Sequence, residues 1–270
     1  MPNPLQVFAE ANSVTLEIAR SAFEHLLMAV KAHHLPASAH AQMHDYYDRM
    51  ILAERYFLHH FAPYLMELDH TFQVKKERPR LLDLGCGVGT QAYLMGLRGA
   101  SVYGIDFKPS RAAAAQAMKP WYTDSGGRDV EVTVDHGDAF QILDQLEPHS
   151  HDGAYTQFAL AYMTPHERML RLIDRVVRPG GRILFREFNA GNIYNRIYSK
   201  VDWLTPQAYQ QIGQSLGWQL ESQQYYWLFP KPLINHSVTG KLAISAEEYL
   251  ARFRMFRPFT GSVTLVFRKN

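Results

Sequence analysis

Three glycines spaced by single residues follow a short apolar run at residues 81–84, and this run contains one acid. The glycines are Gly85, Gly87 and Gly89. Because glycine has no Cβ, its backbone can bend tightly and a ligand can lie against main-chain N–H groups. The stretch therefore predicts a buried strand, a cofactor-binding loop and a helix over residues 90–97.

The spacing of the glycines bears on which ligand binds. A dinucleotide site prefers Gly-x-Gly-x-x-Gly, whereas here the third glycine, Gly89, comes one residue early. An acid about 20 positions further on, Asp106, suits any adenosine ligand because a carboxylate accepts hydrogen bonds from ribose hydroxyls. The loop alone leaves a nicotinamide dinucleotide and other adenosine ligands open.

Further motifs follow in a fixed order along the chain. Asp83 precedes the glycines as Asp-x-Gly-x-Gly-x-Gly, Asp106 ends Gly-Ile-Asp-Phe, residues 137–139 read Gly-Asp-Ala, and residues 178–182 read Arg-Pro-Gly-Gly-Arg. Together they resemble the class I S-adenosylmethionine-dependent methyltransferases over roughly residues 78–190.

The resemblance implies an α/β fold: a seven-stranded, mostly parallel Rossmann-like sheet of order 3-2-1-4-5-7-6, with the last strand antiparallel. It also implies an N-terminal helical lid over residues 1–75. Residues 76–270 would then form the S-adenosylmethionine-binding domain, and the whole chain would be one globular unit.

The cofactor that the resemblance implies is S-adenosylmethionine. In that family, Asp106 would pair with the ribose hydroxyls, Asp138 with the adenine amino group, and Gln157 and Phe158 with the amino-acid moiety. Cys86 is interpreted as a space-filling residue of the loop. The expected cofactor-binding residues are Asp83, Gly85, Cys86, Gly87, Asp106, Phe107, Asp138, Ala139, Gln157, Phe158 and Tyr47.

Methyl transfer is an in-line displacement at a sulfonium, so positioning supplies most of the catalysis and a base is optional. Tyr162 follows the expected fourth strand. Glu187, in Glu-Phe-Asn, resembles a Glu-Pro-Asn element of small-molecule and lipid methyltransferases, although Phe188 replaces the proline. His166 lies nearby and is expected on a solvated helix surface. These three residues are the catalytic candidates, and packing or structural hydrogen bonding is the alternative for each.

The composition limits the partners. A net charge of +2 and a pI near 8.5 are too mild for a nucleic-acid surface. One cysteine permits no intramolecular disulfide. No run approaches the roughly 20 apolar residues of a membrane span. We expect a cytoplasmic protein, a possible homodimer, that acts on a small-molecule or lipid-like acceptor.

The elements that position these residues alternate. Strands are expected over residues 80–84, 101–105, 130–134, 153–156, 182–186, 218–229 and 261–269. Helices are expected over residues 90–97, 110–122, 139–145, 165–177 and 205–216. Two capping boxes are expected, at Thr164 with Glu167 and at Ser245 with Glu248. Before the loop, apolar residues at helical spacing predict helices over 12–31 and 39–70, the second kinked or divided by Pro63, and a charged linker over 75–80.

Several features remain open. His40 and His44 lie one helical turn apart, but no third metal ligand is evident and no metal is expected. Aromatic residues crowd the chain after Phe188, from Tyr194 and Tyr198 onward, and predict either packing or an acceptor pocket. Residues 253–259 interleave aromatic residues with arginines, and contact with a lipid headgroup is a further alternative for them.

Two rival functions also remain open. One is a nicotinamide-dependent oxidoreductase, and the other is a non-catalytic cofactor- or partner-binding domain of the same fold.

Overall fold

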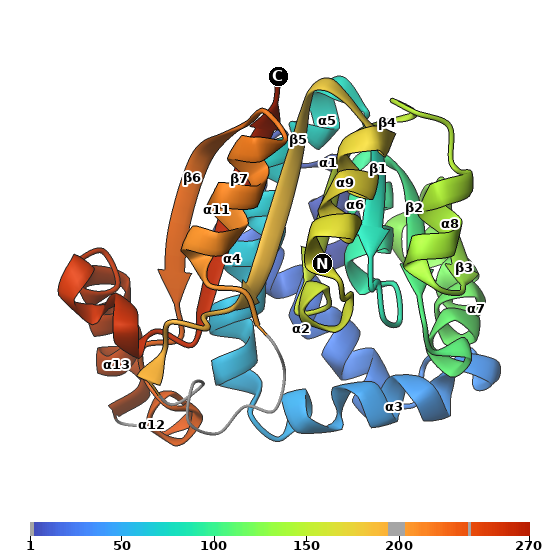
Figure 1. Ribbon diagram of the computed structural model, residues 1–270. Helices are drawn as coiled ribbons and strands as arrows, with labels where there is room; N and C mark the ends of the chain where they lie inside the picture. Colours follow the sequence, from blue (N-terminus) through green and yellow to red (C-terminus); the bar gives the residue numbers. More distant parts are fainter. Residues whose placement is uncertain (1–2, 194–202, 237–238) are drawn as a thin grey trace. The chain divides into compact units, whose positions relative to one another are not determined.

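The computed structural model describes residues 3–193, 203–236 and 239–270 (Figure 1). Its seven strands form one sheet of order β3-β2-β1-β4-β5-β7-β6, which confirms the expected fold class. The strands are β1 (Arg80–Leu84), β2 (Ser101–Asp106), β3 (Val132–His136), β4 (His151–Gln157), β5 (Val177–Phe188), β6 (Trp218–Tyr226) and β7 (Ser262–Lys269).

The chain divides into two compact units, Met1–Ile142 and Leu143–Asn270. Helices of the first unit are α1 (Pro4–Glu10), α2 (Leu16–Lys31), α3 (Ala37–Ile51), α4 (Glu54–Phe72), α5 (Val74–Glu77), α6 (Thr90–Arg98) and α7 (Pro109–Gly126), with α8 (Ala139–Gln145) across the boundary. Helices of the second unit are η1 (Leu160–Tyr162), α9 (His166–Val176), α11 (Pro206–Ser215), α12 (Lys231–Asn235), α13 (Thr239–Leu250) and η2 (Arg254–Phe259). The predicted lid role of residues 1–75 stays a prediction.

In the first unit, β2 pairs in parallel with β1 on one side and with β3 on the other. The registers place Asp83 opposite Gly104 and Asp106 opposite His136. Both acids are therefore near the carboxyl ends of their strands, which is the edge at which open α/β sheets bind ligands.

The expected 39–70 helix is two helices, but they do not divide at Pro63, and a kink at Pro63 stays a prediction. The chain breaks at Leu52 and Ala53, while Pro63 lies inside α4. The break lets α3 pack on α7 while α4 packs on α2, so tertiary contacts decide its position. Half of the expected charged linker, residues 75–77, is also helical, as part of α5, and the short helix α1 was not predicted.

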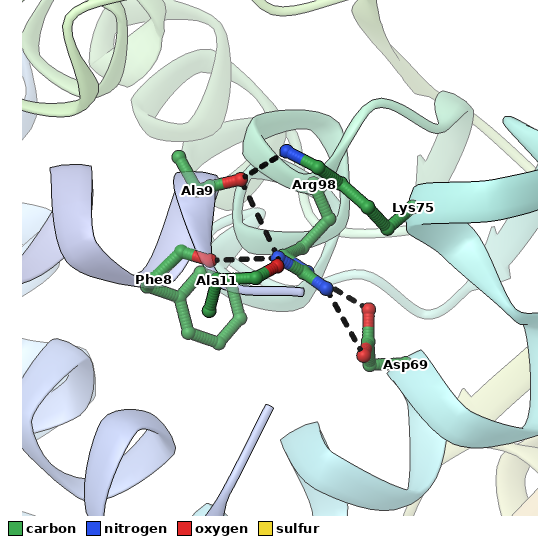
Figure 2. Close-up of polar contacts among 6 residues, drawn as sticks. All are labelled: Phe8, Ala9, Ala11, Asp69, Lys75 and Arg98. Atoms are coloured by element: carbon green, nitrogen blue, oxygen red, sulfur yellow. Dashed lines mark hydrogen bonds and ion pairs between the residues drawn. The ribbon is translucent and has the colours of Figure 1, made fainter. Parts of the chain in front are cut away.

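A buried guanidinium ties α1 to the rest of the first unit (Figure 2). Arg98 donates from Nε to Asp69 Oδ1 at 2.9 Å and from Nη2 to Oδ2 at 3.3 Å. Its Nη1 donates to the Phe8 carbonyl at 3.0 Å and also to the carbonyl of Ala11. These acceptors lie at the end of α1, where carbonyls lack helical partners, so the cation satisfies them.

The second unit pairs β4 with β5 in parallel, and β7 antiparallel between β5 and β6. Both expected capping boxes are wrong. The N-cap residue of α9 is Pro165, which has an extended backbone and no side-chain cap hydrogen bond. Thr164 therefore precedes the N-cap position and does not cap the helix. Helix α13 already begins at Thr239, so Ser245 lies in its interior.

Removal of the Arg98 cation should be costly because Asp69 and the carbonyls of α1 would remain buried without it. We expect Arg98→Met to lower the free energy of unfolding by about 3–5 kcal/mol. The matched control is Arg20→Met, since Arg20 pairs with Glu24 at 3.7 Å on the surface and its loss should cost about 1 kcal/mol or less. Urea unfolding measures both, and equal losses would contradict this role of Arg98.

Candidate functional site

The glycine loop turns sharply over the end of β2. Gly85, Gly87 and Gly89 have φ of 72°, 59° and 78°, in the left-handed region that favours glycine. The N–H groups of Gly85 and Cys86 both donate to the Ile105 carbonyl, at 2.8 and 3.0 Å. The loop is therefore attached to the strand that carries Asp106.

The Asp106 carboxylate closes this attachment. Its Oδ2 accepts from the Gly87 N–H at 2.8 Å and its Oδ1 from the Lys108 N–H at 2.9 Å. A carboxylate offers about four acceptor positions, so about two remain. Asp106 therefore keeps acceptor capacity beside the glycine turn, and its predicted role toward ribose hydroxyls stays a prediction.

Tyr46, on α3, packs against the loop from the other side. A Cβ at Gly87 would lie 2.9 Å from Tyr46 Oη, which shows how closely the side chain approaches the backbone. The Arg111 guanidinium lies 5.2 Å from the centre of the Tyr46 ring. Burial raises the pKa of Tyr46 to about 12 although Arg111 opposes the shift, so the phenol is neutral at physiological pH. The sequence pattern predicts that Tyr47 contacts the cofactor. In the structure, the neighbouring Tyr46 is the tyrosine that approaches Gly87.

The other predicted residues of the loop are buried. The Tyr47 hydroxyl bonds to Thr90 Oγ1, at the first residue of α6, and its ring meets that of Tyr46 edge-on. Asp83 is buried near the end of β1. Burial, followed by the charges of Asp83 and Asp106, raises the pKa of the Cys86 thiol well above its ordinary value. Cys86 therefore remains a protonated thiol, as a space-filling role requires.

The expected adenine residues lie around the start of α8. Asp138 Oδ1 accepts from the Phe140 N–H at 2.9 Å, and the Gly137 N–H donates to the Asp106 carbonyl at 3.1 Å. Ala139 is buried, whereas the ring of Phe107 is exposed. An exposed flat ring next to Asp106 is available for stacking on a nucleobase.

In the second unit, Phe158 follows Gln157, the last residue of β4, and has a left-handed backbone with φ of 56°. Its N–H donates to the Arg186 carbonyl at 2.8 Å. Its ring lies 4.5 Å from that of Phe188 and 4.9 Å from that of Trp227, between ring centroids. This side chain is thus part of an aromatic cluster.

Glu187 is a buried carboxyl group, 2% exposed, at the end of β5. Its Oε1 accepts from the N–H groups of Ala159 and Leu160, at 3.2 and 3.0 Å. Among the described residues, none donates to its buried Oε2. Burial raises the pKa of Glu187 to about 8, although the backbone N–H groups oppose the shift. A carboxyl group with such a pKa can hold or release a proton near neutral pH.

The other two catalytic candidates differ in exposure. Tyr162 is 69% exposed at the end of η1, in the turn whose amides bind Glu187. His166 is buried at the start of α9, so the expected solvated position is wrong. The side of α9 that carries His166 is buried at this position. The apolar pattern of the helix alone did not indicate that burial.

The aromatic cluster includes Trp203, which stacks on Phe188 with ring centroids 4.7 Å apart. Trp203 Nε1 is buried and meets no acceptor in the part of the chain that the structure describes. Asn189 follows Phe188, and its Nδ2 donates to the Thr260 carbonyl at 3.0 Å. It thereby joins the residue after β5 to the segment that precedes β7. Tyr194 and Tyr198 lie outside the described residues.

The histidine pair expected on one helix has a neighbour. His33 precedes α3, and its ring centroid lies 4.2 Å from that of His40 and 6.3 Å from that of His44. The sequence pattern did not indicate this third ring because it comes from the turn after α2. The expectation of no metal stays a prediction.

Comparison with known proteins agrees with this geometry. Residues 82–185 match the family model described as "Methyltransferase domain". The chain is 32% identical over 110 residues to a ubiquinone biosynthesis O-methyltransferase of Pseudomonas putida, covering 41% of this chain and 44% of the relative. It is 29% identical over 139 residues to the S-adenosyl-L-methionine-dependent Diels-Alderase iccD of Talaromyces variabilis, covering 50% and 43%.

A solved structure shares the fold. It is a SAM dependent methyltransferase from Archaeoglobus fulgidus, with a TM-score of 0.54 and 16% sequence identity, over 77% of this chain and 93% of that one. The strand order and glycine loop define a Rossmann-like cofactor-binding protein. With the methyltransferase-domain match over residues 82–185, they agree with the fold and cofactor that the resemblance to class I S-adenosylmethionine-dependent methyltransferases implies. The chain spans less than half the length of the curated relatives it matches.

Gly87 combines a left-handed backbone with a close neighbour, whereas Gly180 has φ of 76° and nothing within 4 Å of the position that a Cβ would occupy. Gly180→Ala should cost about 1 kcal/mol from backbone strain alone. Gly87→Ala should cost more because Tyr46 must also move. Urea unfolding of both variants measures the difference, and equal costs would show that the Tyr46 contact adds nothing.

Proposed function

We propose that the chain transfers a methyl group from S-adenosylmethionine to a small, apolar acceptor, aromatic or lipid-like. The observation that carries the cofactor assignment is the Asp106 carboxylate, bonded to the Gly87 amide and with acceptor positions left for a ribose. Gly85 and Gly87 would let the cofactor lie against the backbone. Asp138 would accept a hydrogen bond from its adenine amino group, and Gln157 would bind its amino-acid moiety. The bound cofactor supplies an electrophilic methyl group.

The aromatic cluster of Phe158, Phe188, Trp203 and Trp227 supports an apolar acceptor. Flat side chains bind rings and chains through contact area, and Trp203 offers an indole N–H that one acceptor oxygen would satisfy. The similarity to a ubiquinone biosynthesis O-methyltransferase supports an oxygen acceptor on a lipid-like ring.

Glu187 is our candidate for proton transfer. Its Oε1 is held by two backbone amides while Oε2 remains for a substrate hydroxyl. As a carboxylate it would accept the hydroxyl proton as the oxygen takes the methyl group. The same two amides hold the turn that carries Tyr162, so Glu187 would also orient that residue toward the acceptor. His166, being buried, is better suited to packing.

Two alternatives are distinguishable. The similarity to a Diels-Alderase supports a protein of this family that uses the bound cofactor without transferring its methyl group. The oxidoreductase alternative has lost its support, because the family match is to methyltransferases.

The test is to incubate the protein with S-adenosylmethionine and a panel of phenols, catechols and quinols, and to measure S-adenosylhomocysteine. We expect stoichiometric methylated product and S-adenosylhomocysteine for at least one acceptor. Saturable cofactor binding without S-adenosylhomocysteine, together with acceptor rearrangement, would favour the non-transferring alternative.

Tyr162→Phe and Glu187→Gln should lower turnover by at least about a hundredfold, the low end of what one general acid or base contributes, with cofactor affinity near that of the wild type. Glu221→Gln, on the surface of β6, is the matched control and should retain activity. Full activity of both site variants would remove these residues from the acceptor site.

The raised pKa of Glu187 also predicts a pH dependence of stability. Between about pH 4.5 and pH 8 the folded chain keeps a proton on Glu187 that the unfolded chain releases. The wild type should therefore lose stability relative to Glu187→Gln as pH rises through this window, by up to about 1.4 kcal/mol per pH unit. Urea unfolding at several pH values measures this, and parallel profiles would contradict the raised pKa.

A further inference from the structure

The second unit exposes a group of large apolar side chains near its end. These residues, which we name the α13–η2 patch, are Leu242, Tyr249, Phe253, Met255 and Phe259, and all are exposed. All five lie within an 18-residue segment, whereas the other exposed large apolar residues among those described are spread along the chain. A group of exposed apolar residues close together marks a surface that meets an apolar partner.

The residues of the patch lie on two consecutive elements, α13 and η2, and on the segment between them. Leu242 and Tyr249 lie seven residues apart on α13, which places them on one face of the helix. The Tyr249 ring meets the Phe253 ring edge-on at 5.1 Å between centroids. Phe253 leads into η2, which buries none of its own residues and exposes Met255 and Phe259 four positions apart.

The charges around the patch are mainly positive. Residues 239–259 contain four basic and two acidic residues. Lys241, Arg252 and Arg254 are exposed. Glu247 is buried, and its oxygens accept from the N–H groups of Trp227 and Phe229 at 2.9 and 3.2 Å, so its charge is directed into the protein.

Apolar and aromatic side chains edged by exposed cations complement the surface of an anionic phospholipid bilayer. The apolar chains reach the acyl boundary while the cations meet the headgroups. We propose that the α13–η2 patch binds the surface of an anionic membrane, without spanning it. No helix in the described residues is long and apolar enough to cross a membrane. The proposal does not depend on the methyl-transfer activity.

The test is sedimentation of the full chain with vesicles of phosphatidylcholine alone and of phosphatidylcholine mixed equally with phosphatidylglycerol, without cofactor. We expect the protein to sediment with the mixed vesicles and to be released by salt. The double variant Met255→Ser with Phe259→Ser should lower the partition coefficient at least tenfold, since each removes several apolar groups worth about 0.8 kcal/mol apiece when buried in lipid.

The charge variant Arg252→Gln with Arg254→Gln should lower binding to mixed vesicles by roughly fivefold for each cation. The control is Leu52→Ser, because Leu52 is 78% exposed in the first unit and its loss should change nothing. Circular dichroism checks that every variant is folded.

Three results would overturn the proposal. The wild type would remain in the supernatant with both kinds of vesicle, or Leu52→Ser would lose as much binding as the patch variants. The third is a wild-type dimer, seen by analytical ultracentrifugation, that the Met255→Ser and Phe259→Ser changes dissociate while no vesicle binding occurs. That result would make the patch an interface between two copies of the chain.

Discussion

The hydrogen bond from the Gly87 amide to the Asp106 carboxylate is the contact on which the cofactor half of the site depends. It joins two motifs 19 residues apart and fixes the glycine loop over the end of β2. Replacing a glycine of the loop by a larger residue would strain the backbone, because all three glycines have left-handed conformations. At Gly87 the new side chain would also meet Tyr46. These constraints hold the Asp106 carboxylate in place before any ligand binds, and such pre-organisation lowers the cost of binding.

Glu187 also accepts from backbone amides, but through Oε1 alone, and no described residue donates to its Oε2. In both places a buried carboxyl group holds a turn and keeps acceptor capacity for a ligand. Burial raises the pKa of Glu187 to about 8, so this group can exchange a proton near neutral pH. That property is why our proposal assigns proton transfer to Glu187, whereas it assigns binding to Asp106 from its contacts with the glycine loop.

Local sequence patterns predicted β1 well because it is a short, mostly apolar run that ends at a glycine, and the resemblance to a known family implied the order of the strands. Arg80–Leu84 agrees to the residue, and the order of all seven strands is as expected. The errors arose where distant contacts decide. The break at Leu52 accompanies the packing of α3 on α7. The close approach of Tyr46 to Gly87 depends on how α3 meets the loop, and the cofactor role of Tyr47 stays a prediction. The burial of His166 likewise depends on packing that a helical pattern does not specify.

The central claim is that the glycine loop and Asp106 bind S-adenosylmethionine. The most direct measurement is calorimetric titration of the wild type and of Asp106→Ala with S-adenosylmethionine, and of the wild type with NAD. We predict saturable binding of S-adenosylmethionine and none of NAD, with affinity at least about tenfold weaker in the variant, since hydrogen bonds to a charged group are each worth roughly 1.5–3 kcal/mol. Binding of NAD alone, or unchanged affinity in Asp106→Ala, would contradict the account.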